Sequence, residues 1–233
     1  MKNNSPKLLL FDIDGTLITG RGIPKKVFLQ TVGKRYPNYP AEKDFRFSGL
    51  TDPVIVQKIL EVSGAPDFDN HTLINEILNE FLDCLQKNMN KDNPPHLLSG
   101  VSELLEACHK IDECFLGLVT GNMERGAEIK LSAADLDHYF PVGAFGSDNY
   151  DRNLLPPLAV KRAEKFYNIS FSKENIWIIG ESIHDVRCAK ANGLRCLAAA
   201  ASTTTEEELH AEQPDAVLKD LSDLQKIMNI LGF

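Results

Sequence analysis

The cysteines and histidines of this sequence lack the spacings that build a metal cluster or a disulfide framework. There are five cysteines, an odd number, and no two of them form a Cys-x-x-Cys pair. The six histidines include no His-Glu-x-x-His segment. These absences argue against structural zinc and disulfides, and favour the reduced thiols of a cytosolic protein.

Long hydrophobic runs are also missing. No apolar segment approaches the roughly 18 residues that a membrane-spanning helix requires. Residues 1–6 contain no apolar region of signal-peptide length. We therefore expect a cytoplasmic protein without a membrane partner.

An excess of basic residues is the third absence. The 25 lysines and arginines are outnumbered by 33 acidic residues, which gives a net charge of -8. Non-specific binding to nucleic acid depends on many phosphate-neutralising cations, so nucleic acid is not an expected partner. A small anionic substrate is compatible with this balance, because a few local charges or a metal ion can hold it.

The sequence does contain short apolar runs that alternate with amphipathic stretches. Residues 7–11 and 115–119 are typical of buried strands, and residues 101–110 carry apolar side chains at helical spacing. Further strands are expected at 141–145, 175–179, 195–199 and 215–218, and further helices at 124–136, 156–167, 183–192 and 222–231. This alternation predicts an α/β fold, with a doubly wound, Rossmann-like parallel sheet covered on both faces.

Residues 20–95 interrupt the alternation. Two amphipathic helices are expected there, at 54–61 and 73–86, and strand signals are scarce. Residues 92–95 read Asp-Asn-Pro-Pro, which is typical of a linker. The sequence therefore predicts a catalytic core built from residues 1–19 and 96–233, and a small helical cap domain built from residues 20–95.

The strongest chemical signal lies at residues 11–17, Phe-Asp-Ile-Asp-Gly-Thr-Leu. Asp12 and Asp14 follow a buried strand, where unpaired carboxylates are costly unless a cation neutralises them. Gly15 allows the backbone to turn sharply. A bare Asp-x-Asp is more often an acidic surface turn, but the strand before it and Gly-Thr after it favour a functional site.

This segment resembles the first motif of the haloacid dehalogenase-like superfamily, and the rest of the chain follows the family's order of motifs. The resemblance is to the helical-cap subgroup that includes phosphoglycolate phosphatase and beta-phosphoglucomutase. It implies that Asp12 attacks phosphorus, that Asp14 protonates the leaving oxygen and later activates water, and that Mg²⁺ is the cofactor. Dehalogenating members lack an aspartate at the position of Asp14, so this residue favours phosphate chemistry.

Residues 118–122, Leu-Val-Thr-Gly-Asn, resemble the second motif of the family. A hydroxyl group followed by successive backbone N–H groups at a helix start forms an anion cradle, although Thr-Gly-Asn also suits an ordinary helix start. The resemblance implies that Thr120 is catalytic and binds phosphate together with Gly121 and Asn122.

Residues 179–185, Ile-Gly-Glu-Ser-Ile-His-Asp, resemble the fourth motif. The family usually has Gly-Asp followed by a second aspartate four residues later, whereas this chain has Glu181 in the first of these places. Magnesium prefers carboxylate oxygens. The resemblance implies a metal site formed by Asp12, Asp14, Glu181 and Asp185; whether Glu181 or Asp185 touches the metal directly stays open, and helix capping is the alternative role.

The family also requires a cation between these two motifs, usually a lysine before a proline. Here the segment around residues 156–157, Pro-Pro, has Arg152 before it and Lys161 after it. We favour Arg152 as the catalytic, phosphate-binding cation, because arginine keeps its charge and can bind two oxygens at once. Lys161 is the alternative.

The expected cap offers weaker signals. Arg46 precedes residues 47–52, which resemble a cap loop of phosphoglycolate phosphatase-like members. Arg46 and Arg125 are candidate substrate contacts, as is Arg21, although an ordinary surface arginine is the commoner situation for each.

The sequence therefore predicts a Mg²⁺-dependent phosphoric monoester hydrolase that acts through an aspartyl-phosphate on a small phosphorylated metabolite, phosphoglycolate-like or a sugar phosphate. A phosphomutase of the beta-phosphoglucomutase type and a catalytically degenerate family member are the alternatives, the latter because of Glu181 and the missing Lys-Pro. A signalling receiver domain uses similar residues, but is usually about half this length and lacks a cap. The substrate and the oligomeric state are not readable from the sequence.

Overall fold

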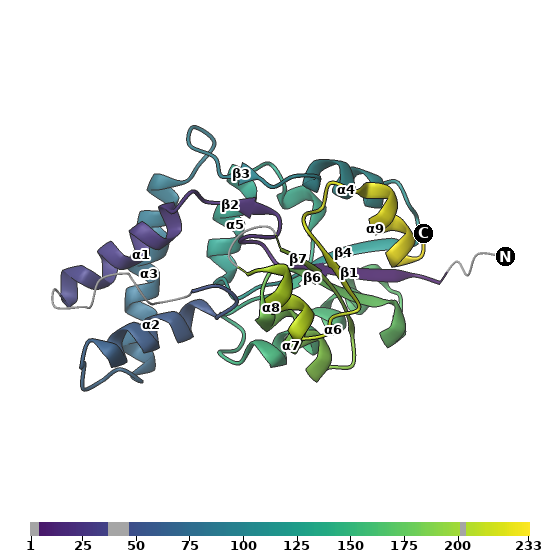
Figure 1. The fold of residues 1–233 in the computed structure, drawn as a ribbon. Coiled ribbons are helices and arrows are strands. Elements are labelled where there is room, and N and C mark those ends of the chain that lie inside the picture. Colours follow the sequence, from purple (N-terminus) through teal and green to yellow (C-terminus); the bar gives the residue numbers. More distant parts are fainter. Residues whose placement is uncertain (1–4, 37–46, 201–203) are drawn as a thin grey trace.

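A parallel sheet of six strands forms the centre of the computed structural model, which describes residues 5–36, 47–200 and 204–233 (Figure 1). The strands are β1 (Lys7–Phe11), β4 (Cys114–Val119), β5 (Gly143–Ala144), β6 (Ile176–Gly180), β7 (Arg195–Ala199) and β8 (Ala216–Leu218). Their order is β5-β4-β1-β6-β7-β8, and all neighbouring pairs are parallel. The predicted parallel sheet is confirmed, with β1 between β4 and β6.

Helices cover both faces of this sheet. On one face lie α4 (Val101–His109), α5 (Glu124–Ala133) and α9 (Leu224–Leu231); on the other lie α6 (Leu155–Tyr167), α7 (Ile183–Ala191) and α8 (Glu206–Ala211). Leu9 and Phe11 of β1 pack into the first layer, while Leu8 and Leu10 pack into the second, and all four are fully buried. Apolar side chains on both faces stabilise a strand only between two layers, which explains the central place of β1.

Three helices form a separate unit beside the ends of the strands (Figure 1). They are α1 (Ile23–Arg35), α2 (Asp52–Val62) and α3 (His71–Asn88), and they bury Phe28, Ile59 and Phe81 in a further cluster, to which α5 adds Ala133. This helical insertion, together with the sheet, confirms the predicted fold class. No helix in the described part of the chain, the 18 residues of α3 included, is long and apolar enough to cross a bilayer.

A short antiparallel ribbon joins the insertion to the sheet. Strand β2 (Ile18–Thr19) pairs with β3 (His96–Leu97), and Ile18 lies opposite Leu97. The chain therefore leaves the sheet layer and returns to it at neighbouring points. The predicted domain limits, at residues 19–20 and 95–96, fall at this ribbon and stay a prediction.

Helices α1 and α8 were not predicted. Helix α1 is hard to recognise because its four buried positions include Thr31 and its last turn contains Gly33. At the start of α4, Gly100 is the capping residue, with a φ of 81°. A Cβ atom on Gly100 would lie 1.9 Å from the carbonyl oxygen of Leu221, so the close approach of two chain segments requires glycine there.

Candidate active site

The predicted site residues gather where three neighbouring strands end. Asp12 directly follows β1, Thr120 directly follows β4, and Glu181 directly follows β6. Because β4, β1 and β6 are adjacent and parallel, their carboxyl ends lie at one edge of the sheet. Asp12, Asp14 and Glu181 line a cavity of about 480 Å³ whose other wall comes from the helical insertion. Thr120 is buried beside this cavity.

Arg152 is the cation of this cavity that contacts Asp12. Its Nη2 atom lies 3.1 Å from Oδ1 of Asp12 and 2.5 Å from Oδ1 of Asp185. The side chain is only 7% exposed. Burial disfavours the guanidinium charge, but the carboxylates of Asp185 and Asp12 outweigh it and hold the pKa of Arg152 above its usual value. Lys161 is exposed on α6, so geometry favours Arg152 of the two predicted cations.

Asp12 lies in a strongly acidic environment. Burial raises the pKa of Asp12 to about 7, Arg152 opposes this rise, and the carboxylates of Asp185 and Asp14 add to it. Asp12 is 5% exposed, and Asp185 is fully buried. The cluster around Asp12 therefore carries more negative charge than Arg152 alone neutralises, which is the situation in which carboxylates bind a cation.

The segment after β6 shows that helix capping and site chemistry involve the same residue. Ser182 caps α7, and its backbone N–H and hydroxyl donate to Oδ2 of Asp185 at 3.0 and 2.7 Å. The other oxygen of Asp185 accepts from Arg152. Glu181 is 2% exposed and accepts a hydrogen bond from the hydroxyl of Ser48, in the loop before α2. Both oxygens of Asp185 are thus already engaged by the protein.

A second buried cation, Lys130 on α5, was missed by the sequence analysis. Its Nζ atom lies 2.5 Å from Oδ2 of Asp14 and 2.5 Å from Oδ1 of Asn122. The Asn122 amide donates to the same Oδ2 atom at 2.8 Å and to the hydroxyl oxygen of Thr120 at 2.8 Å. The available signal was a lysine one turn after Ala127, on the face that α5 buries.

Asp52, at the start of α2, is another missed residue. Its backbone N–H donates to the carbonyl oxygen of Gly121 at 2.8 Å, and its Oδ2 atom accepts from the N–H of Met123 at 2.8 Å. Burial raises the pKa of Asp52 to about 6, while Lys130 opposes this rise. Asp52 therefore fastens the helical insertion to the loop after β4.

The four predicted metal ligands are neighbours but do not converge on one point. Oδ2 of Asp14 contacts Lys130, and Glu181 contacts Ser48. Within the described ranges, the one group of acidic or histidine side chains with ligand atoms within 4.8 Å of one another is Asp135, Asp137 and His138, all exposed. Exposed acidic clusters are common without an ion, so we assign no site there.

The two predicted substrate arginines that the structure describes, Arg21 and Arg125, do not line the cavity. Arg125 instead contacts α3, with Nη1 2.8 Å from Oδ1 of Asp83 and Nη2 2.8 Å from Oε1 of Gln86. Arg21 donates to the carbonyl oxygen of Pro94 at 3.2 Å. Arg46 lies outside the described residues.

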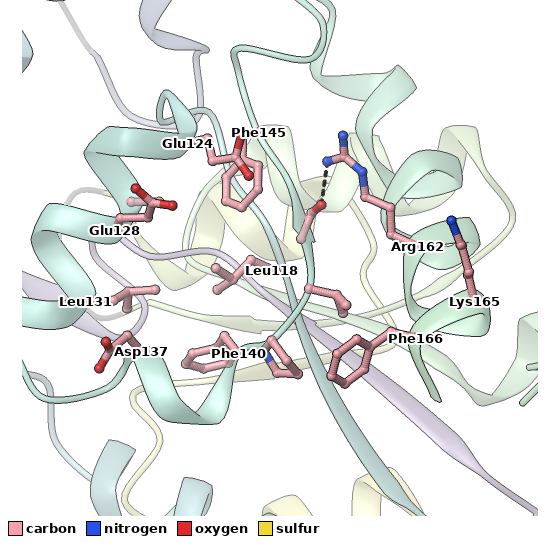
Figure 2. A pocket seen from close by; sticks show the side chains of 14 residues that line it. Leu118, Glu124, Glu128, Leu131, Asp137, Phe140, Phe145, Arg162, Lys165 and Phe166 are labelled. Carbon is pink, nitrogen blue, oxygen red and sulfur yellow. Dashed lines mark hydrogen bonds between the residues drawn. The ribbon is translucent and has the colours of Figure 1, made fainter. Parts of the chain in front are cut away.

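A larger cavity of about 640 Å³ lies at the outer edge of the sheet, beside β5. Figure 2 shows Glu124, Glu128 and Asp137 on one side of it, and Arg162 and Lys165 on the other. Leu118, Phe140 and Phe145 lie between them. None of the described candidate residues lines this cavity, so it offers no alternative site for the predicted chemistry.

Comparisons with known proteins agree on the type of fold. The sequence profile of haloacid dehalogenase-like hydrolases matches residues 9–199. Pyrophosphatase PpaX of Anoxybacillus flavithermus is 25% identical over 231 residues, which cover 95% of this chain and 96% of that protein.

Two solved structures are similar over nearly the whole chain. A predicted phosphoglycolate phosphatase from Haemophilus somnus superposes with a TM-score of 0.74, at 20% identity, over 98% of this chain and 100% of that one. CbbY from Rhodobacter sphaeroides, in complex with phosphate, gives a TM-score of 0.72 at 19% identity, over 94% and 96% of the two chains. At these identities the two structures show the fold alone.

Proposed function

The chain belongs to the haloacid dehalogenase-like hydrolase family, and we propose that it is a phosphatase that cleaves a phosphoric monoester through an aspartyl-phosphate on Asp12. One observation carries this proposal. The carboxylate of Asp12 is buried 3.1 Å from Arg152, in a cavity that Asp14 also lines. A nucleophile, a cation for the phosphate and a second acid are thus available to one reacting group.

In the first half of the reaction, a carboxylate oxygen of Asp12 attacks phosphorus, and the bond between phosphorus and the ester oxygen breaks. Arg152 offsets the repulsion between the carboxylate and the phosphate. Thr120 already accepts hydrogen bonds from Asn122, so its own proton is available for a phosphate oxygen. Asp14 gives a proton to the departing oxygen, an effect typically worth about 10²–10⁴-fold.

In the second half, Asp14 is ionised and takes a proton from water. The resulting hydroxide attacks phosphorus, the bond between phosphorus and Asp12 breaks, and inorganic phosphate leaves. The insertion lies over the strand ends and reduces the access of bulk water to the aspartyl-phosphate.

Mg²⁺ is the proposed cofactor, since the excess of buried carboxylates over cations fits a hard divalent ion. Asp12, Asp14, Glu181 and Asp185 are the predicted ligands, but Lys130 and Asn122 hold one oxygen of Asp14, and Asp14 must also carry a proton, so we propose Asp12 and Glu181 as the direct ligands. The two oxygens of Asp185 are held by Ser182 and Arg152, which favours Glu181 as the direct ligand and Asp185 as the residue that orients Arg152. When bound, Mg²⁺ supplies neutralising charge to the transferred phosphoryl group.

Two other reactions use the same residues. Hydrolysis of pyrophosphate is suggested by the relative named pyrophosphatase PpaX. A phosphomutase would return the phosphoryl group to a sugar instead of to water. Net release of phosphate from a simple ester favours the phosphatase over the mutase.

The test measures phosphate release from a panel of phosphomonoesters and from pyrophosphate with Mg²⁺. We expect steady release from at least one ester and its loss on chelation. Asp12→Asn should lower turnover by at least about 10³-fold with the fold retained. Asp112→Asn, at an exposed position, is the matched control. Full turnover by the Asp12 variant, or turnover unchanged after exhaustive chelation, would refute the proposal.

A further inference from the structure

The two walls of the active-site cavity differ in chemistry. On the sheet side the cavity meets Asp12, Asp14, Lys130, Arg152 and Glu181. On the insertion side, the apolar lining residues are Pro24, Phe28, Phe47, Leu50, Ile55 and Phe81, and Ile18 of β2 also lines the cavity. A phosphate held beside Asp12 therefore directs its leaving group toward an apolar wall.

Aromatic rings form the centre of that wall. The ring of Phe28 lies 4.6 Å from that of Phe81 and 6.0 Å from that of Phe47, between ring centroids, and both pairs are tilted. Phe28 and Phe81 are almost fully buried, so the cluster is held by the core of the insertion. Lys25 lies over the ring of Phe47, with its Nζ atom 5.5 Å from the centroid. Tilted rings at these distances are the arrangement in which aromatic groups pack favourably.

The polar side chains of this wall are largely occupied by the protein. Ser48 donates its hydroxyl to Glu181, and Oδ2 of Asp52 accepts from the N–H of Met123. The hydroxyl oxygen of Thr19 accepts from the N–H of Arg21. Lys25, which lies over Phe47, is the other polar side chain of this wall. A leaving group with several hydroxyls would therefore lose hydrogen bonds to water here and regain few.

Resting on the proposed function, we propose that the substrate is a phosphomonoester whose leaving group is an apolar, ring-bearing alcohol or phenol. Transfer of a ring from water to this wall adds binding energy that a polyol of the same size cannot supply. The phosphate binds at the charged wall and the ring at the aromatic wall, so the cavity selects both ends of the molecule.

The test compares kcat/KM for 2-phenylethyl phosphate, glycerol 1-phosphate and pyrophosphate, each with Mg²⁺. Both esters release a primary alcohol, so they differ chiefly in the group that meets the insertion. Burial of the ring should favour 2-phenylethyl phosphate by about 10- to 100-fold. Equal or better kcat/KM for glycerol 1-phosphate or pyrophosphate would overturn the inference alone. No phosphate release from any of the three would refute the proposed function as well.

A matched pair of variants tests whether the aromatic wall causes the preference for the ring-bearing ester. Phe47→Ala should lower the ratio of kcat/KM for 2-phenylethyl over glycerol 1-phosphate by about tenfold. Phe68→Ala, which removes another half-buried ring packed on the same cluster but outside the cavity lining, should keep the wild-type ratio. An equal change in both variants would contradict a role for the aromatic wall. The wild-type comparison decides the question if either variant fails to fold.

A separate observation, the environment of Lys130, carries a second inference. Lys130 and the side-chain amide of Asn122 both donate to one oxygen of Asp14, Oδ2. Lys130 is 4% exposed at its side chain, so its ammonium group is held in place by the protein. With Oδ2 occupied by two donors, a proton carried by Asp14 belongs on the other oxygen, Oδ1.

The geometry points to Lys130 as a positioning residue that fixes which oxygen of Asp14 transfers the proton. This inference also rests on the proposed function. The loss of rate on removal of Lys130 should depend on the leaving group, because a nitrophenolate leaves without a proton and an alkoxide needs one. A merely structural role would slow both reactions alike.

The experiment compares kcat/KM for p-nitrophenyl phosphate and 2-phenylethyl phosphate, which covers only the steps up to departure of the leaving group. Lys130→Met should lower the value for 2-phenylethyl phosphate by about 10²-fold, and that for p-nitrophenyl phosphate by less than about tenfold. Lys130→Arg should recover part of the loss, and Lys219→Met, at an exposed lysine, should match wild type. An equal loss on both substrates would overturn the inference, while an inactive wild type would refute the proposed function. Asn122→Ala, which removes the other donor, gives the same comparison if Lys130→Met does not fold.

Discussion

The sheet-side wall and the insertion-side wall of the cavity are each stabilised by a different kind of interaction. On the sheet side, Arg152 is buried between Asp12 and Asp185, and charge pairing determines the geometry. On the insertion side, the rings of Phe28 and Phe81 pack against each other, and burial of apolar surface determines the geometry. In our proposals, the chemistry belongs to the sheet side and the selection of the leaving group to the insertion side, so different parts of the chain determine them.

Removal of the central cation should give the largest effect. Arg152→Met leaves the carboxylates of Asp12 and Asp185 buried without the cation that pairs with both, and should lower the free energy of unfolding by about 3–5 kcal/mol and abolish turnover. Urea unfolding and phosphate release measure the two losses. Arg162→Met is the control, since Arg162 pairs with Asp148 at a partly exposed site where such a pair contributes about 0–1 kcal/mol. Similar losses in both variants would mean that the sheet side does not depend on a buried ion pair.

Asp52, which joins the insertion to the loop after β4, should make the stability of the protein depend on pH. Burial raises the pKa of Asp52 to about 6 from 3.8, so the folded protein keeps a proton that the unfolded chain releases first. Wild-type stability should therefore fall as the pH rises from about 4 to about 6, and Asp52→Asn should lose less, because only the raised pKa of Asp12 still contributes to the fall.

Each pKa unit corresponds to about 1.4 kcal/mol, so the Asp52 variant should exceed wild type by up to about 3 kcal/mol above pH 6. The variant can still accept the hydrogen bond from Met123 through its amide oxygen. Urea unfolding at several pH values gives the difference, with Asp112→Asn as the control. If the difference in unfolding free energy between Asp52→Asn and wild type does not grow between pH 4 and 6, this explanation of Asp52 is contradicted.

A change at the close contact between Gly121 and the insertion loop should lower catalytic activity more than stability. A Cβ atom on Gly121 would lie 2.1 Å from the carbonyl oxygen of Leu50, in the insertion loop. Gly121→Ala should push that loop away from the strand ends and lower kcat/KM by about 10²-fold, the cost of a misplacement near 1 Å. Steady-state kinetics test this, and an unchanged kcat/KM would show that the loop need not contact Gly121.

The smallest expected effect concerns the insertion alone. Gly33 lies inside α1, and a Cβ atom there meets no atom within 4 Å. Gly33→Ala should stabilise the protein by about 0.5–1 kcal/mol through the lower flexibility of the unfolded chain, with activity unchanged. Thermal unfolding measures it. A loss of activity would show that motion within α1 is coupled to the sheet side.

The sequence predicted the sheet side better than the insertion side, for a physical reason. Runs such as residues 7–11 are apolar on both faces, and such a pattern fits little else than a buried parallel strand. The polar residues at the ends of these strands meet because parallel strands share one edge. Strand order alone therefore brought Asp12 and Glu181 together, although they are far apart in the sequence.

Lys130 and Asp52 escaped prediction because their importance comes from tertiary contacts. Lys130 looks like a solvated helix lysine until α5 is packed against the loop that carries Asn122. Asp52 looks like an ordinary first-turn acid until the insertion meets Met123. Arg125 was predicted as a substrate contact, but its partners Asp83 and Gln86 lie on α3, and the sequence does not reveal a contact between segments at least 39 residues apart.

The ribbon of β2 and β3 has a consequence for how such a molecule can diversify. Because Ile18 lies opposite Leu97, everything between them is attached through two adjacent strands, and the sheet layer contributes only the short span that separates them. A tight turn could close the same gap, since a two-stranded ribbon needs as few as about two connecting residues. A foreign helical unit with neighbouring ends could therefore be grafted between these two strands without changing the path of the chain through the sheet.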